Sequence, residues 1–243
     1  MQKIAIIVPC YNERKRMNTG SFSRFLLDHE DTEIYFVDDG SDDGTPNVLH
    51  SIRSTAAGRV HIISLTENRG KANAVREGLR IAAGENRFRF LGYLDADLST
   101  GPEEFYSLYQ RALGENLDYV IGSRIKLLQS SIERSFFRHL TGRFIATIID
   151  WKYKLGIYDT QCGAKWFRPQ VIIPLLEEKF HTKWFFDVEI FLRMRRKFPS
   201  AVGIEVPLRK WKDPGNSKIG LSHFPTVFSD LYALMSNYPR NKK

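Results

Sequence analysis

The chain has 243 residues, of which 42% are hydrophobic and 26% are charged, so it is long enough for one large domain and has the composition of a soluble globular protein. Its charge is uneven, because residues 1–123 carry 14 Lys and Arg against 18 Asp and Glu, whereas residues 124–243 carry 22 against 10. The basic half has no Lys/Arg-rich run or RNA-binding signature. This argues against a nucleic-acid partner and favours a phosphorylated substrate or an anionic lipid surface.

The sequence also indicates the cellular compartment of the protein. It has no run of about 18 apolar residues, the length that a membrane-spanning helix needs, and it enters a strand-like segment without signal-peptide architecture. Its two cysteines, Cys10 and Cys162, are far apart and lack metal-ligand spacing, which favours free thiols in a reducing compartment. We expect a cytoplasmic protein, attached at most peripherally at the inner face of a membrane.

Short apolar runs alternate with amphipathic segments in the first half of the chain. This alternation is typical of βαβ units, and it predicts a central, mostly parallel sheet with helices on both faces. We expect strands at residues 3–8, 33–37, 60–65, 89–94 and 119–121, and helices at residues 19–28, 45–55, 71–83 and 102–112.

The alternation stops in the second half. There the sequence predicts a long or broken helix at residues 133–155, whose apolar side faces either lipid or the core, and a strand at 202–206 that closes the sheet. Further helical segments are expected at residues 169–176, 186–196 and 225–236. No repeat or linker interrupts residues 1–243, so we expect a single domain.

Acidic clusters follow two of the expected strands. Ligands bind at the carboxyl ends of the strands in an open α/β sheet, so these clusters should converge on one crevice. Asp39, followed by a glycine and a serine, has a carboxylate that can accept hydrogen bonds from a nucleobase edge. The alternative is an Asp-rich turn that caps a helix.

Asp95 and Asp97 follow the fourth strand. On an extended segment their side chains point to opposite sides, so one can bind a metal while the other meets the ribose or the diphosphate. Carboxylates of this kind suit Mg²⁺ or Mn²⁺ carried by a diphosphate. We expect Asp97 to be the direct metal ligand and Asp95 its partner on the nucleotide side; a chance loop pair is the alternative.

Basic residues complete the pattern. Lys71 opens a helix after Asn68, Arg69 and Gly70, an arrangement that favours anion binding, although a capped helix with solvated cations fits equally well. Arg124 ends the fifth strand and Arg138 follows on the next helix. Their guanidinium groups can hold a phosphate acceptor in bidentate fashion, or belong to a solvated basic face.

Several segments resemble glycosyltransferase family 2 of the GT-A fold, which is Rossmann-like, and most closely its polyprenyl-phosphate (dolichyl-phosphate) glucosyltransferases. The resemblance covers nearly the whole chain. The segments that carry it are Pro9-Cys10-Tyr11-Asn12-Glu13, Asp38-Asp39-Gly40-Ser41, Asn68-Arg69-Gly70-Lys71, Asp95-Ala96-Asp97, Gly122-Ser123-Arg124, Asp159-Thr160-Gln161-Cys162-Gly163 with Lys165, Trp184-Phe185-Phe186-Asp187-Val188-Glu189, and Trp211 with Asn216-Ser217-Lys218.

The resemblance implies a role for each site. Residues 1–123 form a nucleotide-binding half and residues 124–243 an acceptor-binding half. Asp187 occupies the position of a general base in many inverting relatives; with a phosphate acceptor, which is already deprotonated, it orients groups instead. Lys218 belongs to a basic lid. The residues that bind the donor are Pro9, Tyr11, Glu13, Asp39, Lys71, Asp95, Gln161 and Lys218.

The implied enzyme is an inverting, metal-dependent hexosyltransferase. UDP-glucose as donor and a polyprenyl phosphate as acceptor are the first choice. GDP-mannose or another UDP-hexose as donor, and a saccharide acceptor in surface-polysaccharide assembly, remain open. A nucleotidyltransferase is disfavoured because Pro9 to Asn12 replaces the expected Gly-rich loop, and a non-catalytic scaffold leaves the acidic clusters without purpose.

Overall fold

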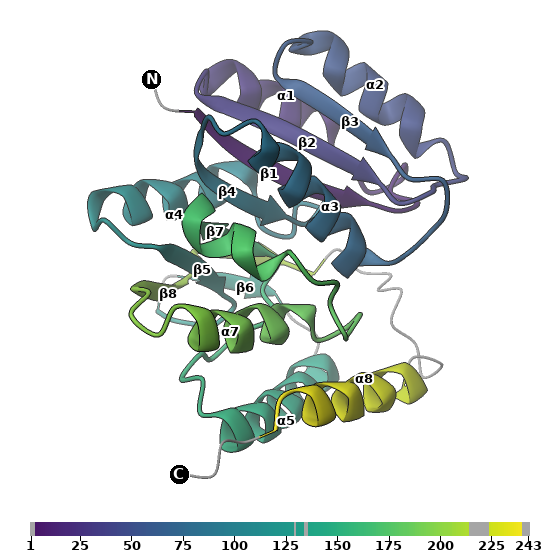
Figure 1. The fold of residues 1–243 in the computed structure, drawn as a ribbon. Coiled ribbons are helices and arrows are strands. Elements are labelled where there is room, and N and C mark those ends of the chain that lie inside the picture. The colour runs from purple at the N-terminus through teal and green to yellow at the C-terminus, as the bar shows by residue number, and fades with distance from the viewer. Residues whose placement is uncertain (1–2, 129, 134–135, 214–223, 240–243) are drawn as a thin grey trace.

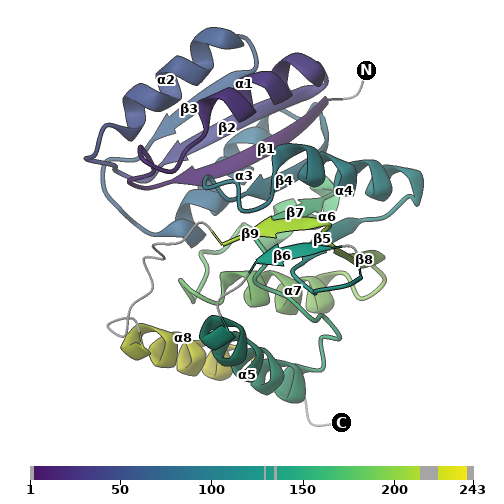
Figure 2. The ribbon, with the colours of Figure 1, turned by 180° about the vertical axis from the view of Figure 1, so that it is seen from behind.

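A computed structural model describes residues 3–128, 130–133, 136–213 and 224–239 (Figures 1 and 2). One sheet has the strand order β3-β2-β1-β4-β7-β5-β8, in which β7 runs antiparallel to both neighbours and the other pairs are parallel. A small parallel pair, β6 and β9, lies outside it. The strands are β1 (Lys3–Cys10), β2 (Thr32–Asp38), β3 (Val60–Ser64), β4 (Phe88–Leu94), β5 (Tyr119–Ser123), β6 (Ser131–Glu133), β7 (Ala164–Phe167), β8 (Gly203–Pro207) and β9 (Lys210–Lys212).

Helices cover both faces of the sheet, as the alternation predicts. Helices α1, α2 and α4 pack on one face, while α3, α6 and α7 pack on the other, with successive residues of β1 alternating between the two cores. The helices are α1 (Thr19–Asp28), α2 (Thr45–Thr55), α3 (Lys71–Gly84), α4 (Pro102–Gly114), α5 (Phe136–Tyr153), α6 (Pro169–Ile172), the 3₁₀ turn η1 (Ile173–Leu175), α7 (Phe186–Lys197) and α8 (Phe224–Asn237).

Helices α5 and α8 form an outer layer against α7, away from the sheet (Figures 1 and 2). Their inward side chains include Ile149 and Leu234, which pack against Val188 of α7. The apolar side of the expected helix at 133–155 is therefore partly core. Within the described ranges, no helix is both long and apolar enough to cross a membrane.

Strand β7 is the main departure from the expected fold. It inserts between β4 and β5, and its Trp166 lies opposite Gly92 in the register. A Cβ at position 92 would come within 2.5 Å of the Trp166 ring, so the close approach requires glycine there. The indole Nε1 of Trp166 donates to the carbonyl of Phe105, 2.8 Å away, and this bond ties the strand to α4.

Candidate active site

The polar motifs meet at the carboxyl ends of the parallel strands. Strands β1, β2, β4 and β5 are parallel to one another, and the residues that end or follow them, Cys10, Asp38, Asp95 and Ser123, lie at their carboxyl ends. The order β2-β1-β4-β7-β5 places the acidic clusters after β2 and β4, the two strands that flank β1. The predicted convergence of the motifs is thus present in the structure.

Asp39 holds the loop that leads into α3. Its carboxylate is buried and accepts hydrogen bonds from the backbone N–H groups of Arg69, at 3.0 Å, and Gly70, at 2.7 Å. These bonds fix the start of α3 beside the carboxyl end of β2. The carboxylate therefore has a structural task, and its role in binding a nucleobase stays a prediction.

The loop after β1 packs against the loop after β2. Pro9 pairs with Val37 at the end of the strand, Tyr11 is half-buried, and the Glu13 backbone N–H donates to Oγ1 of Thr45 at 2.8 Å. The buried Glu13 carboxylate also forms an ion pair with Arg16. Pro9, Tyr11 and Glu13 therefore lie in the loop that packs beside Asp39, and their binding of a donor stays a prediction.

Asp95 and Asp97 lie in a turn and not on an extended segment, so the strand geometry expected for this pair is absent. The turn follows β4 and includes Leu98 with a positive φ of 52°. Oδ1 of Asp97 accepts from the backbone N–H and the hydroxyl of Ser99, at 3.0 and 2.8 Å. Both carboxylates are half-exposed and remain accessible to a ligand.

Lys71, the first residue of α3, forms an ion pair with Asp95 at 2.6 Å. Burial opposes its charge, but the negative charges of Asp95, Asp187 and Asp97 outweigh burial and raise the pKa of Lys71. The side chains of Lys71 and Asp95 are 39% and 34% exposed. A cation thus lies close to three carboxylates at the carboxyl end of β4.

Gly163 joins a distant segment to this turn. The backbone N–H of Asp95 donates to the Gly163 carbonyl at 3.2 Å, and a Cβ at position 163 would lie 2.0 Å from Oδ2 of Asp95. A side chain at position 163 would have to displace the Asp95 carboxylate. The contact with Asp95 explains why a glycine follows Cys162 in the segment at 159–165.

Asp187 sits in a buried polar cluster next to the turn. Nζ of Lys165, with no exposed surface, donates to its Oδ1 at 2.6 Å, and the Tyr93 hydroxyl donates to the same oxygen. Burial, followed by the charge of Asp187, raises the pKa of Tyr93 well above its usual value. Lys165 also donates to the Cys162 carbonyl, and Gln161 donates to the Trp184 carbonyl at 3.3 Å. These bonds tie the 159–165 segment to the start of α7.

Arg124 is paired within the protein. Its Nε and Nη2 atoms each donate to the Asp159 carboxylate at 2.7 Å, and its guanidinium group lies 5.5 Å from the Trp211 ring centre. Burial opposes the charge, but Asp159 outweighs burial and raises the pKa of Arg124. Phosphate binding by Arg124 stays a prediction. Arg138 lies on α5 with its side chain undescribed, and Lys218 lies outside the described residues.

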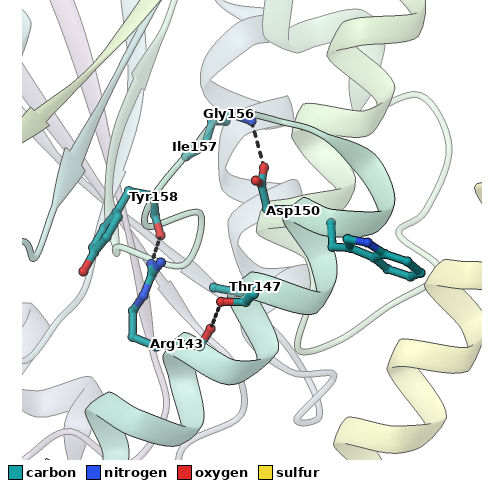
Figure 3. Close-up of a pocket in the computed structure, with 8 residues that line it drawn as sticks. Arg143, Thr147, Asp150, Gly156, Ile157 and Tyr158 are labelled. Atoms are coloured by element: carbon teal, nitrogen blue, oxygen red, sulfur yellow. Dashed lines mark hydrogen bonds between the residues drawn. The ribbon is translucent and has the colours of Figure 1, made fainter.

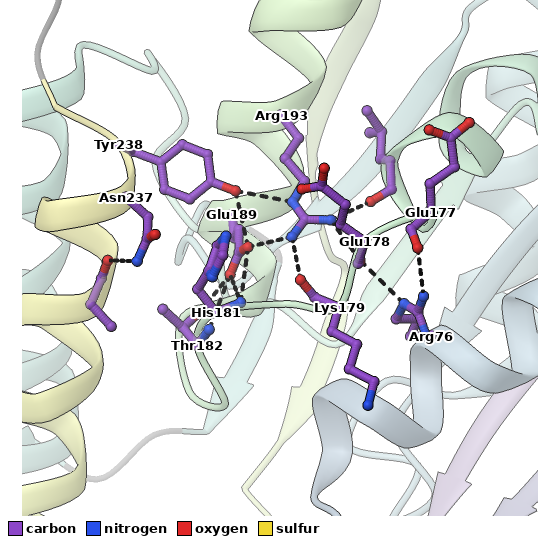
Figure 4. Close-up of polar contacts among 12 residues, drawn as sticks. Arg76, Glu177, Glu178, Lys179, His181, Thr182, Glu189, Arg193, Asn237 and Tyr238 are labelled. Atoms are coloured by element: carbon purple, nitrogen blue, oxygen red, sulfur yellow. Dashed lines mark hydrogen bonds and ion pairs between the residues drawn. The ribbon is translucent and has the colours of Figure 1, made fainter.

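Glu189, in the first turn of α7, lies at the centre of a buried cluster of hydrogen bonds (Figure 4). Its fully buried carboxylate accepts from the backbone N–H groups of His181 and Thr182, from Arg193 at 2.7 Å and from the Tyr238 hydroxyl at 3.0 Å. The cluster ties α7 to the preceding loop and to the end of α8. Only the i, i+4 spacing of Glu189 and Arg193 signals it in the sequence.

Comparison with known proteins identifies the family. The profile of "Glycosyl transferase family 2" matches residues 5–173. The chain is 32% identical over 234 residues to the "Dolichyl-phosphate beta-glucosyltransferase" of Drosophila melanogaster, covering 89% of this chain and 69% of the relative. It is 29% identical over 231 residues to the protein of the same name from Dictyostelium discoideum, covering 89% and 68%.

Solved structures share the fold. Glucosyl-3-phosphoglycerate synthase from Mycobacterium tuberculosis in complex with phosphoglyceric acid gives a TM-score of 0.71 at 14% identity, covering 100% of this chain and 82% of that chain. The same enzyme with Mn²⁺, UDP-glucose and phosphoglyceric acid gives 0.68 at 16% identity, with the same coverage.

The sheet, the acidic turn after β4 and these likenesses define a glycosyltransferase of the GT-A fold. The chain belongs to glycosyl transferase family 2 and is similar to dolichyl-phosphate beta-glucosyltransferases. The resemblance seen in the sequence motifs is thereby confirmed.

Proposed function

We propose that this enzyme transfers a hexose, with inversion, from UDP-glucose to a polyprenyl phosphate. One observation carries the proposal: Gly163 packs on Asp95 while Lys165, two residues later, binds Asp187. The acidic turn of the predicted donor side and the acidic residue of the predicted acceptor side are thereby parts of one contact network. The names of the relatives supply the sugar and the lipid class, and their beta linkage is what inversion of α-linked UDP-glucose produces.

Asp95 and Asp97 fit a divalent cation, Mg²⁺ or Mn²⁺. Among the described residues, the hydrogen bonds of Asp97 engage only Oδ1, which leaves Oδ2 for a metal. Nowhere in the described ranges do three or more His, Cys, Asp or Glu side chains gather so that they could hold an ion. Two carboxylates leave further coordination positions to diphosphate oxygens. When bound, the ion supplies Lewis-acid stabilisation of the departing nucleoside diphosphate.

The remaining donor contacts are assigned from the positions of the described residues and from the family resemblance. Lys71 lies beside Asp95, where its ammonium group can meet the diphosphate. Asp39, Pro9, Tyr11 and Glu13 surround the nucleoside end, and Gln161 and Lys218 complete the proposed donor set. UDP-glucose is the first choice of donor; GDP-mannose or another UDP-hexose is the alternative.

The acceptor side favours a phosphate nucleophile. Asp187 is 4% exposed, and its Oδ1 is already bonded to Lys165 and Tyr93. A phosphate oxygen is deprotonated near pH 7 and attacks the anomeric carbon without a base, so Asp187 orients the sugar. With a saccharide acceptor, the alternative, Asp187 would have to take a proton. Arg124 and Arg138 are the proposed phosphate ligands.

Contact with a membrane surface is part of the proposal, because the acceptor is a lipid. The outer helices expose large aromatic side chains: Trp151 on α5 is 74% exposed, and Tyr232 on α8 is 76% exposed. Lys154 is exposed just after α5, beside the end that carries Trp151. Aromatic and basic residues together suit the inner face of an anionic membrane.

The test is a transfer assay with UDP-glucose, GDP-mannose and UDP-N-acetylglucosamine, with Mn²⁺, with and without farnesyl phosphate. We expect glucosyl transfer to the lipid, and a loss of at least about a hundredfold in Asp97→Ala and Arg138→Ala. Asp28→Ala, an exposed position on α1, is the control and should match the wild type. Metal-dependent donor hydrolysis without lipid transfer would redirect the search to saccharide acceptors. Absence of any reaction with every donor would refute the proposal.

A further inference from the structure

Helices α5 and α8, the outer layer, are joined by hydrogen bonds to each other and to the body of the molecule. The hydroxyl of Tyr153, at the end of α5, donates to the Leu234 carbonyl of α8 at 3.2 Å. On another side, α5 is held by the segment that follows it (Figure 3), because Nη1 of Arg143 donates to the Tyr158 carbonyl at 2.8 Å. The outer layer is therefore a fixed part of the fold.

A single acidic residue, Asp230, reaches from α8 to the segment that leads into α7. It is the only charged residue in the sequence of α8, and it is 7% exposed. Its Oδ2 accepts hydrogen bonds from two successive backbone N–H groups, that of Lys183, at 2.8 Å, and that of Trp184. Burying a carboxylate is costly unless hydrogen bonds compensate it. Its presence in an otherwise uncharged helix therefore indicates a specific task for this acceptor.

The two N–H groups that Asp230 binds stand directly before α7. This helix begins at Phe186, and the side chain of its N-cap residue, Phe185, makes no capping hydrogen bond. A carboxylate from another helix therefore holds the chain where α7 begins. Its negative charge also lies near the amino end of α7, where the helix dipole favours it. Asp230 thus does for α7 what no local capping side chain does.

The beginning of α7 is also where Asp187 lies. Asp187 is the second residue of the helix, three residues after Trp184, which is about one helical turn. The N–H of Trp184 is held by Asp230, and its carbonyl accepts from Gln161 at 3.3 Å. Asp187 itself binds Lys165 at 2.6 Å. The backbone that carries Asp187 is therefore fixed from two directions, and one of them is α8.

We propose that Asp230 is a positioning residue for Asp187, because its hydrogen bonds to the backbone before α7 set the place of the Asp187 carboxylate. The inference rests on the proposed function, in which Asp187 orients the transferred sugar. None of the predicted site residues lies on α8. The inference gives this outer helix a part in the transfer step without any contact with the substrate.

The first test is a double-mutant cycle on stability. Lys165→Met removes the partner of Asp187, and Asp230→Ala removes the bonds to residues 183 and 184. Urea unfolding is measured for the wild type, both single variants and the double variant. Substitutions that share no partner usually have additive effects. If Asp230 places Asp187 for its ion pair, Lys165→Met should cost less stability in the Asp230→Ala background than in the wild type. Additive effects would overturn the inference.

The second test is kinetic. Asp230→Ala should lower kcat for glucosyl transfer at least about tenfold, with little change in KM for UDP-glucose, because an interaction made in the transition state is lost. Asp230→Asn keeps an oxygen that can accept both N–H groups and should retain most of kcat. Asp230→Glu keeps the charge but displaces the accepting oxygen by one methylene group. It should also lower kcat, and it replaces the Ala variant in both tests if that variant does not fold.

Leu234→Ala is the matched control. Leu234 lies one turn further along α8 and packs in the same cluster as Val188 of α7, so its truncation loosens the outer layer without removing a bond to residues 183 and 184. It should leave kcat unchanged, and its effect on stability should add to that of Lys165→Met. An equal loss of kcat in Leu234→Ala would overturn the inference, because any loosening of the layer would then have the same effect.

Two further results would overturn it: wild-type kcat in Asp230→Ala, and an Asn variant as impaired as the Ala variant. A wild type that transfers no hexose from any donor would instead refute the proposed function. The stability cycle, which needs no substrate, then decides by itself whether Asp230 positions Asp187.

Discussion

Gly163 and Asp95 are in such close contact that a single carbon added at position 163 would lie 2.0 Å from a carboxylate oxygen of Asp95. The two residues are far apart in the sequence, and each belongs to a motif that resembles the family. Their contact couples the conformation of the acidic turn to the segment at 159–165. Any movement of one of them has to be accommodated by the other.

Gly163→Ala tests this contact. Overpacking should destabilise the fold by about 1–3 kcal/mol and push Asp95 out of place, so we expect transfer to fall by at least about tenfold, with a higher KM for the donor. Steady-state kinetics and thermal unfolding measure both effects. Gly114→Ala, at the end of α4 with no atom within 4 Å of the added carbon, is the matched control and should change neither. Wild-type kinetics in Gly163→Ala would contradict the contact.

Lys165→Met tests the buried ion pair. Removing one partner leaves the Asp187 carboxylate buried without its counter-charge, and we expect a loss of about 3–5 kcal/mol in the free energy of unfolding. The double variant Lys165→Met/Asp187→Met replaces both charges by apolar groups and should recover most of that stability while remaining inactive. Urea unfolding of the single and double variants gives the coupling energy. A single variant as stable as the wild type would show that the pair is not formed.

Stability at acid pH should depend on Glu33, at the amino end of β2. Burial disfavours its charge, but hydrogen bonds from Arg87, Lys3 and His61 outweigh burial and lower its pKa from 4.5 to about 2. The folded-state pKa is depressed, so the stabilisation is present above about pH 4.5 and is lost as the pH falls towards 2. The shift corresponds to about 3 kcal/mol for this buried group.

Urea unfolding between pH 2 and pH 7 measures this effect. Glu33→Gln should be less stable than the wild type at neutral pH and approach it near pH 2. Glu33 lies at the amino end of its strand, whereas the acidic turn lies at the carboxyl ends of the strands. Transfer activity of the folded variant should therefore be unaffected. A stability difference that is independent of pH would contradict the assignment.

The thiols should be unreactive in the folded protein. Cys10 and Cys162 are both buried, and burial, with a smaller effect from the charge of Asp159, raises the pKa of Cys162 to about 12. At pH 8 the thiolate is a minute fraction. We expect no rapid reaction with a thiol reagent in buffer and reaction of both cysteines in urea. Rapid native labelling of one thiol would mean that its segment opens readily.

The sequence predicted the parallel part of the sheet well because its signals are local. Apolar runs of three to six residues alternate with helical patterns, and the acidic motifs follow the strands directly. Strand β7 was not predicted, because Ala164 to Phe167 is short and contains a lysine, which is rarely buried. Its identity as a strand depends on contacts with β4 and β5 that no local pattern reports.

The partners of the site residues were likewise beyond the sequence. Arg124 was expected to bind phosphate, and its pairing with Asp159, 35 residues later, depends on how β5 and the 159–165 segment meet. In the sequence Glu189 stands out only as part of a motif that resembles the family, whereas it accepts hydrogen bonds from His181, Thr182 and Tyr238, which lie outside that motif. Residue type and position predicted where charges gather, but not which charges neutralise one another.

The antiparallel insertion of β7 also has a consequence for how the molecule assembles. Strands β4 and β5 both pair with β7 and lie on opposite sides of it, so residues 1–123 cannot form one continuous sheet by themselves. During synthesis the gap between β4 and β5 closes only after residue 167 has emerged. The same segment carries Gly163 and Lys165, so the strand that makes the sheet continuous also brings Gly163 against Asp95 and positions Lys165 for its ion pair with Asp187.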